Sequence, residues 1–361
     1  MYPLAINAWA EEEVEAACAQ IRSGYTTMGQ KTKDFEEAFA AFHGCKYAVM
    51  VNSGSSANLL MVAALVYSKR LPRGSRVAVP ALSWNTTYAP LEMFGMEMEF
   101  VGIDNSLTID PYEISGVVHN VTLPDAIFAV NLLGNPCDYS SFPSEPILIE
   151  DNCESLGATY GNKMCGTVGV MGSHSLFFSH HIHTMEGGVV TTDDEELYRL
   201  LLMLRAHGWT RDLPENKGSK DWTFAVPGFN VRPTDVQAAA GIEQLKKLPA
   251  FLDARRKNGE VYMDLFSDQG YKVNGDSSWF AFPFFANPPN TDEFETRPIV
   301  AGNIGKHEVM EFYKQYALLP DGVDRTGTLS GEWLDAAHNG FMIGNHPHDC
   351  SDALNRMRAL I

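Results

Sequence analysis

The chain has 361 residues, of which 45% are hydrophobic and 20% charged, and its formal net charge is −18. This length accommodates about two domains, and the composition is that of a folded globular protein. The negative charge argues against a broad nucleic-acid-binding or anionic-membrane surface, because both partners are polyanions. No apolar run approaches the roughly 20 residues of a membrane span, and the acidic N-terminus is unlike a signal peptide. We therefore expect a soluble, cytoplasmic protein.

The six cysteines are scattered along the chain and form no C-x-x-C pair. Zinc and iron–sulfur sites normally need clustered cysteines. We expect free thiols, as in other proteins of a reducing compartment.

Helices and strands are predicted to alternate from residue 30 onward. Apolar spacing and a glycine stop predict a helix over residues 33–44. A strand over Tyr47–Val51 follows, and after a polar turn a long apolar helix begins near Ala57. Further strands are expected in RVAVP, MEFVGID, AIFAVNLLG, ILIED and GVVTT. Their nearly continuous apolarity is typical of a parallel sheet covered by helices.

The sequence changes character after a helix predicted over residues 234–248. A basic helical pattern, FLDARRKNGEVYMDLF, comes next, and WFAFPFF with scattered prolines and glycines follows it. We predict a large α/β domain over residues 1–249 and a smaller α+β domain over residues 250–361. Only ANPPNTDEFET separates WFAFPFF from RPIV, and its two prolines oppose a helix. Because a crossover between parallel strands needs about a dozen residues or more, the small domain is expected to be abbreviated.

A run of small polar residues, Asn52 to Ser56, joins the first strand to the next helix. Free backbone N–H groups and the dipole at a helix N-terminus favour an anion, so this run is a candidate phosphate site. Serine and glycine are also ordinary capping residues, and that interpretation stays open.

The predicted strand ILIED ends in Glu150 and Asp151. This places a carboxylate at the carboxyl end of a parallel strand, where the ligand sites of α/β folds form. Such a carboxylate can keep a pyridinium nitrogen protonated, which makes pyridoxal phosphate (PLP) an electron sink. A solvated loop acid or a helix cap is the alternative interpretation.

Three histidines, His180, His181 and His183, lie between Ser175 and the segment Glu186-Gly187-Gly188. A metal site is one interpretation of this group. However, adjacent histidines point in different directions, and no carboxylate or cysteine lies beside them at metal-ligand spacing. We expect no metal, one functional histidine and two structural ones.

The order of these motifs resembles the DegT/StrS family of PLP-dependent sugar aminotransferases. SGSSA, the aromatic residue of VPALSWNTT, the acid of IEDNCESLGA, an S-x-x-x-x-K…EGG-like segment and PGFNVRP…QAA occur in the family's order. In the family, a lysine lies five residues after the serine and six before the glutamate; here both Ser175 and Glu186 count to His180. The resemblance implies the fold-type-I aminotransferase architecture, with a large α/β domain and a smaller C-terminal α+β domain.

Longer segments, among them YAVMVNSGSSANLLM, RAHGWTR and SSWFAF, are similar to sugar 3-dehydratases of this family. The similarity runs from about residue 20 to the C-terminus. It implies a GDP-linked 4-keto-6-deoxymannose as substrate and a place in the biosynthesis of a deoxysugar for lipopolysaccharide.

The resemblance also implies a role for each matching residue. The cofactor phosphate is expected at Gly54, Ser55, Ser56 and Ser175, with Asn230 contributed by the partner subunit of a homodimer.

For the cofactor ring, Trp84 is expected to stack on the pyridine and Asp151 to bind its nitrogen. Glu154 lies where the family usually has a glutamine near the ring hydroxyl. Arg232 matches the arginine that is expected to receive the carboxylate of L-glutamate.

Histidine in place of lysine implies a change of reaction. Imidazole forms no stable Schiff base, but its ordinary pKa of about 6.5 suits proton transfer near neutrality. His180 is therefore expected to move a proton at the C4′ carbon of a non-covalently held cofactor, as PLP or pyridoxamine phosphate (PMP). The C3 hydroxyl of a nucleotide-linked 4-keto-6-deoxyhexose then leaves, and the amino group donated by glutamate is lost as ammonia.

Two other functions remain open from the sequence. An aminotransferase could use another lysine, but Lys163 lies 17 positions before His180, and Lys217 and Lys220 fall in a polar loop. A non-catalytic sugar-nucleotide-binding relative would leave Asp151 and Arg232 without an evident purpose.

Overall fold

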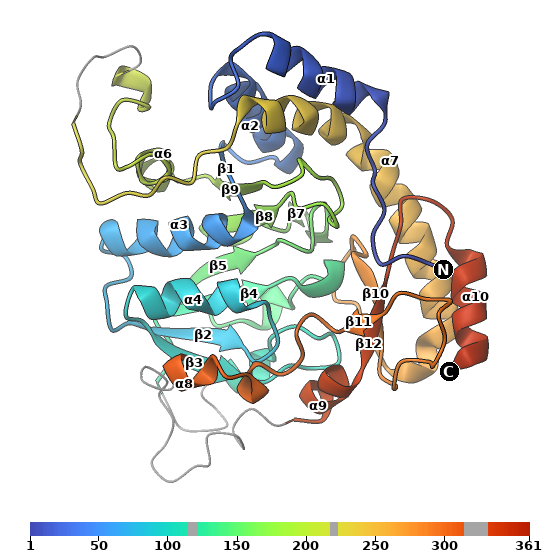
Figure 1. Cartoon of the computed structure of the whole chain (residues 1–361). Helices are drawn as coiled ribbons and strands as arrows, with labels where there is room; N and C mark the ends of the chain where they lie inside the picture. Colours follow the sequence, from blue (N-terminus) through green and yellow to red (C-terminus); the bar gives the residue numbers. More distant parts are fainter. Residues whose placement is uncertain (115–121, 217–222, 314–330) are drawn as a thin grey trace.

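The computed structural model describes residues 1–114, 122–216, 223–313 and 331–361. Its centre is a seven-stranded sheet with the strand order β1-β9-β8-β5-β4-β2-β3, and helices cover both faces (Figure 1). The strands are β1 (Tyr47–Val51), β2 (Arg76–Pro80), β3 (Glu97–Val101), β4 (Ala126–Val130), β5 (Ile147–Asp151), β8 (Met171–Ser175) and β9 (Gly188–Thr192). The predicted α/β class is confirmed, and every predicted strand of this sheet is present.

Strand direction differs from the prediction at one edge of the sheet. β8, β5, β4, β2 and β3 are parallel, whereas β9 runs antiparallel to both β8 and β1. The expectation of a wholly parallel sheet is wrong there, because an apolar run such as GVVTT carries no information on direction. The sequence patterns also miss β8, since its residues MGSHS are mostly polar although all are buried.

Ten helices lie around the sheets of the described chain. They are α1 (Glu11–Arg22), α2 (Gln30–His43), α3 (Gly54–Tyr67), α4 (Asn85–Met93), α5 (Pro111–Ile114), α6 (Glu195–Arg205), α7 (Asp235–Phe266), α8 (Met310–Tyr313), α9 (Glu332–Asn339) and α10 (Ser351–Leu360). α3 packs against α4 and α6, and α2 packs against α7. Alternate β1 residues enter the two layers: Val49 and Val51 face one core, Ala48 and Met50 the other, as the two-residue period of a strand requires.

The end of α2 and the start of α3 are set by a glycine and a serine cap. α2 agrees with the helix predicted over residues 33–44 and ends at Gly44, whose φ of 69° favours glycine. α3 begins at Gly54, not near Ala57, because the Ser53 hydroxyl accepts a hydrogen bond from the Ser56 N–H and caps the helix. Ser55 and Ser56 therefore belong to the first helical turn.

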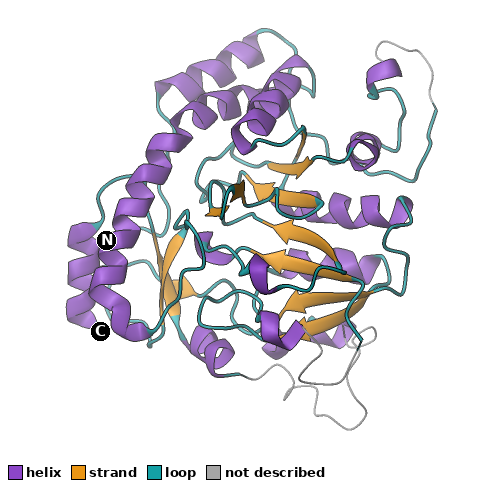
Figure 2. Cartoon of the chain, turned by 180° about the vertical axis from the view of Figure 1, so that it is seen from behind, coloured by secondary structure: helices purple, strands orange, loops and turns teal. Residues whose placement is uncertain are grey.

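α7 is one continuous helix of 32 residues, with Pro249 inside it. It joins the two helical patterns that the sequence presents separately, and the predicted domain boundary at residues 249 and 250 falls within it. The division into two domains stays a prediction. Figure 2 shows α7 running from the end of the molecule that α1 and α2 form to the side where both termini lie.

The C-terminal part contains a three-stranded sheet with the order β10-β12-β11. Its strands are β10 (Ala281–Phe284), β11 (Arg297–Pro298) and β12 (Phe341–Gly344), and β12 is antiparallel to both neighbours. Residues 285–296, which connect β10 to β11, contain no helix. A short hairpin, β6 (Thr159–Tyr160) and β7 (Lys163–Met164), completes the strands.

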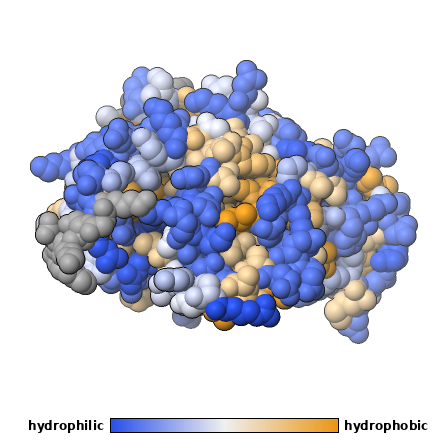
Figure 3. Space-filling model, turned by 90° about the horizontal axis from the view of Figure 1, so that it is seen from above, coloured by the Kyte–Doolittle hydropathy of each residue, from blue (hydrophilic) through white to orange (hydrophobic). Residues whose placement is uncertain are grey.

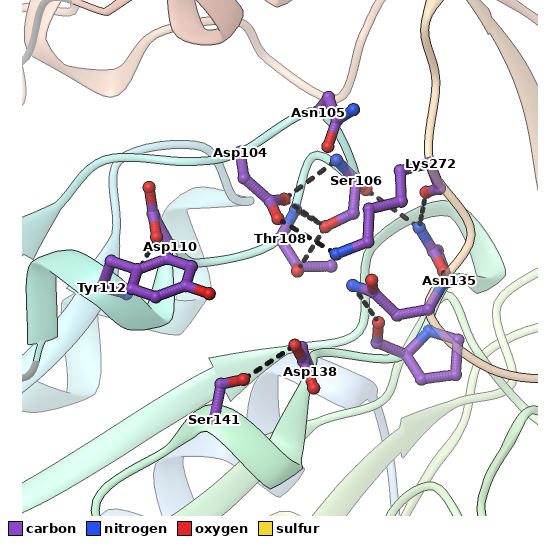
Figure 4. A network of polar contacts seen from close by, with 12 residues as sticks. Asp104, Asn105, Ser106, Thr108, Asp110, Tyr112, Asn135, Asp138, Ser141 and Lys272 are labelled. Atoms are coloured by element: carbon purple, nitrogen blue, oxygen red, sulfur yellow. Dashed lines mark hydrogen bonds and ion pairs between the residues drawn. The ribbon is translucent and has the colours of Figure 1, made fainter.

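Asn135 ties the C-terminal part to the large sheet (Figure 4). Its side-chain amide donates hydrogen bonds to the carbonyl of Ser106, over 3.0 Å, and to that of Lys272, over 2.8 Å. The Lys272 ammonium lies 3.9 Å from Asp104. These contacts fix the loop after β4, which forms one wall of the main cavity. Among the described residues, no helix is long and apolar enough to cross a membrane.

Candidate active site

A cavity of about 450 Å³ lies at the carboxyl ends of the parallel strands, within the usual size range of small-molecule sites. Seven of the ten candidate residues line it: Gly54, Ser55, Trp84, Asp151, Glu154, Ser175 and His180. They come from separate turns that follow β1, β2, β5 and β8, so the sheet topology brings them together.

The first turn of α3 forms the end of the cavity that suits an anion. Gly54 packs so closely that an added Cβ would lie 2.8 Å from both the Cys153 sulfur and the Ser175 Cβ. Ser175 closes this end from the tip of β8. Gly54 and Ser55, the first residues of α3, line this end of the cavity, and a helix N-terminus favours an anion.

Ser56 lies beside this end of the cavity and does not line it. Its hydroxyl donates to Asn52 Oδ1 over 2.6 Å, and its N–H donates to the capping Ser53 hydroxyl. The structure therefore engages both polar groups of Ser56 within the turn.

Asp151 is held by hydrogen bonds from two helices. Its Oδ2 accepts hydrogen bonds from Asn58 Nδ2 on α3 and from Thr87 Oγ1 on α4, each over 2.8 Å. Its Oδ1 accepts the Cys153 N–H at 3.2 Å. Asn58 and Thr87 are buried, so these hydrogen bonds fix the direction of the carboxylate.

Glu154 lies on the same wall in a poorer hydrogen-bonding environment. Its Oε2 accepts one hydrogen bond, from the Leu133 N–H over 3.1 Å. Burial raises the pKa of Glu154 to about 7, and the Asp151 charge acts in the same direction, against Leu133 and Arg297. The side chain is therefore protonated in a large fraction of molecules near neutrality.

Trp84 stands at the mouth of the cavity as the N-cap residue of α4, with 52% of its surface exposed. The Arg297 guanidinium carbon lies 5.9 Å from the centre of its ring, and an Arg297 nitrogen donates to the Val300 carbonyl over 3.0 Å. Such an exposed aromatic face is free to stack on a flat ligand.

His180 lies between two aromatic rings on the cavity wall. Ring-centre distances are 5.1 Å to Phe280 and 6.0 Å to Phe177. Burial lowers the pKa of His180 to about 3, and the positive charges of Arg255 and Arg297 act in the same direction. In the chain alone His180 is therefore an uncharged base, with a pKa below the ordinary value for imidazole.

A second cavity, of about 20 Å³, lies behind His180. The N-terminal residues Leu4, Ala5, Ile6 and Ala8 form part of its wall. His180 therefore lines both cavities, as Ser179, Phe280 and Arg297 also do, and the smaller cavity holds about one water molecule.

The other two histidines of the cluster have structural contacts. His181 is fully buried, with Nε2 lying 3.0 Å from the Ser278 carbonyl. His183 stacks on Trp9 with ring centres 5.3 Å apart. The described residues contain no group of three or more potential ligands arranged for a metal.

Asn230 and Arg232 lie outside the cavity of their own chain. Arg232 Nε donates to Asn230 Oδ1 over 3.1 Å. Their predicted roles are not tested by this arrangement and stay predictions.

No lysine of the described ranges lines the cavity. Lys163 is exposed on β7, and Lys217 and Lys220 lie outside the described residues.

Comparison with known proteins decides the family. The model of the DegT/DnrJ/EryC1/StrS aminotransferase family matches residues 7–298. The chain belongs to this family. One relative, the GDP-4-keto-6-deoxy-D-mannose 3-dehydratase from Escherichia coli O55:H7, is 43% identical to this chain over 394 residues, covering 100% of this chain and 99% of the relative. The enzyme of that name from Yersinia pseudotuberculosis is also 43% identical, covering 99% of this chain and 97% of the relative.

Solved structures agree with this assignment. The E. coli dehydratase with bound hydrated PLP superimposes with a TM-score of 0.89 at 42% identity, covering 100% of this chain and 99% of that one. A structure of GDP-4-keto-6-deoxymannose 3-dehydratase with a trapped PLP–glutamate geminal diamine gives a TM-score of 0.88 at 42% identity, with 100% of both chains covered. The expected aminotransferase architecture of the DegT/DnrJ/EryC1/StrS family is confirmed.

The residues present fit PLP, the cofactor of this family. The anion end at Gly54 suits a phosphate, and the face of Trp84 is free to stack. The more weakly bonded Oδ1 of Asp151 suits a ring nitrogen. Asn58, Thr87 and Arg297 are site residues that the motifs do not predict, although Asn58 lies in YAVMVNSGSSANLLM, Thr87 in VPALSWNTT and Arg297 at the start of RPIV.

Proposed function

We propose that this chain is a PLP-dependent 3-dehydratase acting on GDP-4-keto-6-deoxymannose, with L-glutamate as amino donor. The observation that carries this proposal is His180 on the wall of a cavity of about 450 Å³ that no described lysine lines. The full-length similarity to dehydratases of that printed name supports the choice of substrate. A related structure with bound GDP-perosamine supports a GDP-linked sugar.

The proposal assigns the phosphate to Gly54, Ser55 and Ser175. Ser56 supports the turn, and Asn230 of a second copy completes the site. The place of Gly54 and Ser55 on the cavity wall and the helix dipole favour this assignment.

For the rest of the cofactor, Trp84 stacks on the ring and Asp151 binds its nitrogen. Glu154 lies near the ring hydroxyl, and Arg232 of the partner copy receives the glutamate carboxylate. The hydrogen bonds that orient Asp151 support its assignment, because they hold the carboxylate in one direction from two helices.

PLP, when bound, supplies an aldehyde for the amino group of glutamate and a ring that accepts electrons. His180 is uncharged and therefore able to accept a proton from the C4′ carbon. Arg297 lines the cavity, and a ligand anion bound near it would oppose its field and raise the pKa of His180 toward the ordinary value. Because the imidazole forms no covalent bond to the cofactor, water rather than a lysine releases the product, and ammonia departs.

A homodimer is part of the proposal. Asn230 and Arg232 do not line their own cavity, and Phe177, which does line it, is an exposed apolar side chain. Phe178, Met185 and Phe224 are further exposed apolar side chains of the described chain. Figure 3 shows apolar atoms gathered across the middle of the face seen from above. A second copy of the chain would cover such surface.

The chain is proposed to act in the cytoplasm without nucleic-acid or membrane partners, in the biosynthesis of a lipopolysaccharide deoxysugar. The six free cysteines and the net charge of −18 support this setting.

The deciding experiment combines purified protein, PLP, glutamate and GDP-4-keto-6-deoxymannose, with mass spectrometry of the sugar. Loss of the C3 oxygen with retention of the C4 ketone is the expected result. A 4-amino sugar that keeps its C3 hydroxyl would overturn the proposal. A protein–cofactor adduct trapped by borohydride without amine substrate would instead indicate an aminotransferase using another lysine.

A further inference from the structure

Two carboxyl groups on one wall of the cavity have unequal surroundings. Asp151 accepts two side-chain hydrogen bonds at 2.8 Å and a backbone hydrogen bond at 3.2 Å. Glu154 accepts one backbone hydrogen bond and forms no salt bridge with any residue that the structure describes. Glu154 therefore has fewer donors to stabilise its charged form, and an acid in such surroundings is able to hold a proton.

The single donor to Glu154 comes from a constrained turn. Leu133 has a φ of 54°, in the left-handed region that a leucine seldom adopts. This conformation directs its N–H to Oε2 of Glu154. One carboxyl oxygen is thereby fixed to the backbone, and the group remains part of the wall that also carries His180.

The charges that face Glu154 do not cancel its protonation. Asp151 favours the protonated form, and Arg297, across the cavity, opposes it. Cys153 and Tyr271 also lie close enough to interact, and burial raises the pKa of each well above its ordinary range, so both are uncharged near neutrality. A bound cofactor phosphate would further favour the neutral acid, since it adds negative charge and excludes water.

We propose that Glu154 is the proton donor of the elimination: it holds a proton on its carboxyl group and gives it to the departing C3 hydroxyl. This inference rests on the proposed dehydratase function, because only a dehydratase expels that hydroxyl. His180 then acts as the base and Glu154 as the acid, and both line the same cavity.

Protons and electrons balance in this step. His180 takes the proton from carbon, and the electron pair of that C–H bond moves through the conjugated system and breaks the C3–O bond. The oxygen keeps the pair of the broken bond, takes the Glu154 proton and leaves as water. Imidazolium and carboxylate remain, and proton exchange through solvent restores both groups.

The decisive variant is Glu154→Gln, which keeps the shape and the hydrogen-bonding capacity but has no transferable proton. Dehydration is expected to fall by about 100-fold or more, the usual contribution of a general acid. The rate at which glutamate converts bound PLP to PMP, measured by absorbance in a single turnover, should fall far less. Glu154→Asp should recover part of the lost dehydration.

A second readout needs neither sugar nor turnover. Difference infrared spectroscopy of the PLP-loaded protein is expected to show a carboxylic-acid band that disappears as the pH rises through about 7. The band should be absent from Glu154→Gln and present in the matched control Glu186→Gln, whose carboxylate is exposed at the same cavity.

Three results would overturn the inference: no such band in the wild-type protein, dehydration by Glu154→Gln close to the wild-type rate, or an equal loss of both half-reactions. The last result would indicate a binding role. Failure of the dehydratase proposal itself is distinguished by the wild-type protein, which would then give no dideoxy product at all.

Discussion

The side-chain amide of Asn58 donates a hydrogen bond of 2.8 Å to Asp151, and Asn58 belongs to the helix whose first turn forms the anion end of the cavity. Thr87 reaches the same carboxylate oxygen from the helix that Trp84 caps. One buried carboxylate therefore links the N-terminal parts of α3 and α4 at the cavity. Its position depends on both helices.

Replacing Asn58 by leucine should weaken this arrangement. A buried carboxylate loses one of its two strongest donors, at a cost of about 1–3 kcal/mol in unfolding free energy. We also expect weaker PLP binding, measured by fluorescence titration. Thr87→Val, which removes the other donor with little change of shape, should behave similarly. Unchanged PLP affinity in both variants would show that these donors do not position Asp151.

His180→Asn should keep cofactor binding and lose dehydration, because asparagine fills the space but accepts no proton at carbon. Proton transfer by a positioned base accelerates a reaction by about 100-fold to 10,000-fold. We therefore expect the steady-state rate to fall by at least about 100-fold. His183→Asn, outside the cavity wall, is the matched control for a cluster histidine. Turnover of His180→Asn at the wild-type rate would remove His180 from the mechanism.

Gly54→Ala should reduce affinity for PLP. Its Cβ would lie 2.8 Å from Cys153 and Ser175, so the first turn of α3 must shift away from its ligand position. We expect at least about a tenfold increase in Kd, equivalent to about 1.4 kcal/mol. Gly331→Ala is a suitable control, because no atom lies within 4 Å of its added Cβ. Wild-type affinity in Gly54→Ala would contradict the phosphate assignment.

Mild acid should destabilise the fold. Burial lowers the pKa of His43, His183 and His346 to about 4, whereas an unfolded chain takes up these protons near 6.5. The unfolded state therefore binds more protons as the pH falls from 6.5 toward 4, and the stabilising contribution of the neutral histidines is lost over that window.

The measurement is urea unfolding of the cofactor-free protein at pH 7.5 and at pH 5.5. We expect a lower midpoint at pH 5.5, with about 1 kcal/mol or less from each histidine. Glu154 acts in the opposite direction, since its raised pKa favours the folded state at lower pH. A His43→Gln variant should show a smaller pH effect, and an unchanged midpoint in the wild-type protein would contradict the burial of these rings.

Apolar runs are sufficient to predict most strands, because parallel strands that are buried on both faces consist almost entirely of apolar residues. They were insufficient for β8, where MGSHS is buried through hydrogen bonds and ring contacts; His174, for example, lies 4.6 Å from His43 between ring centres. The direction of β9 and the continuity of α7 through Pro249 depend on tertiary packing, which local patterns do not encode.

For the site, motif order identified seven residues that meet at one cavity. It did not identify Asn58 or Thr87, whose function depends on contacts with a residue 93 and 64 positions away. The environment of Glu154 was equally hidden, because protonation follows from burial and from the number of donors, and neither quantity is written in a motif.

The small cavity behind His180 gives the N-terminal segment an unusual importance. The Tyr2 hydroxyl donates to the Gly344 carbonyl over 2.9 Å, and the Trp9 indole donates to the His183 carbonyl over 3.0 Å, so both ends of this segment are anchored. Shortening the chain by its first eight residues would remove part of the wall of a cavity that His180 also lines. We therefore expect the loss of a segment remote from the strand ends to change the surroundings of the imidazole.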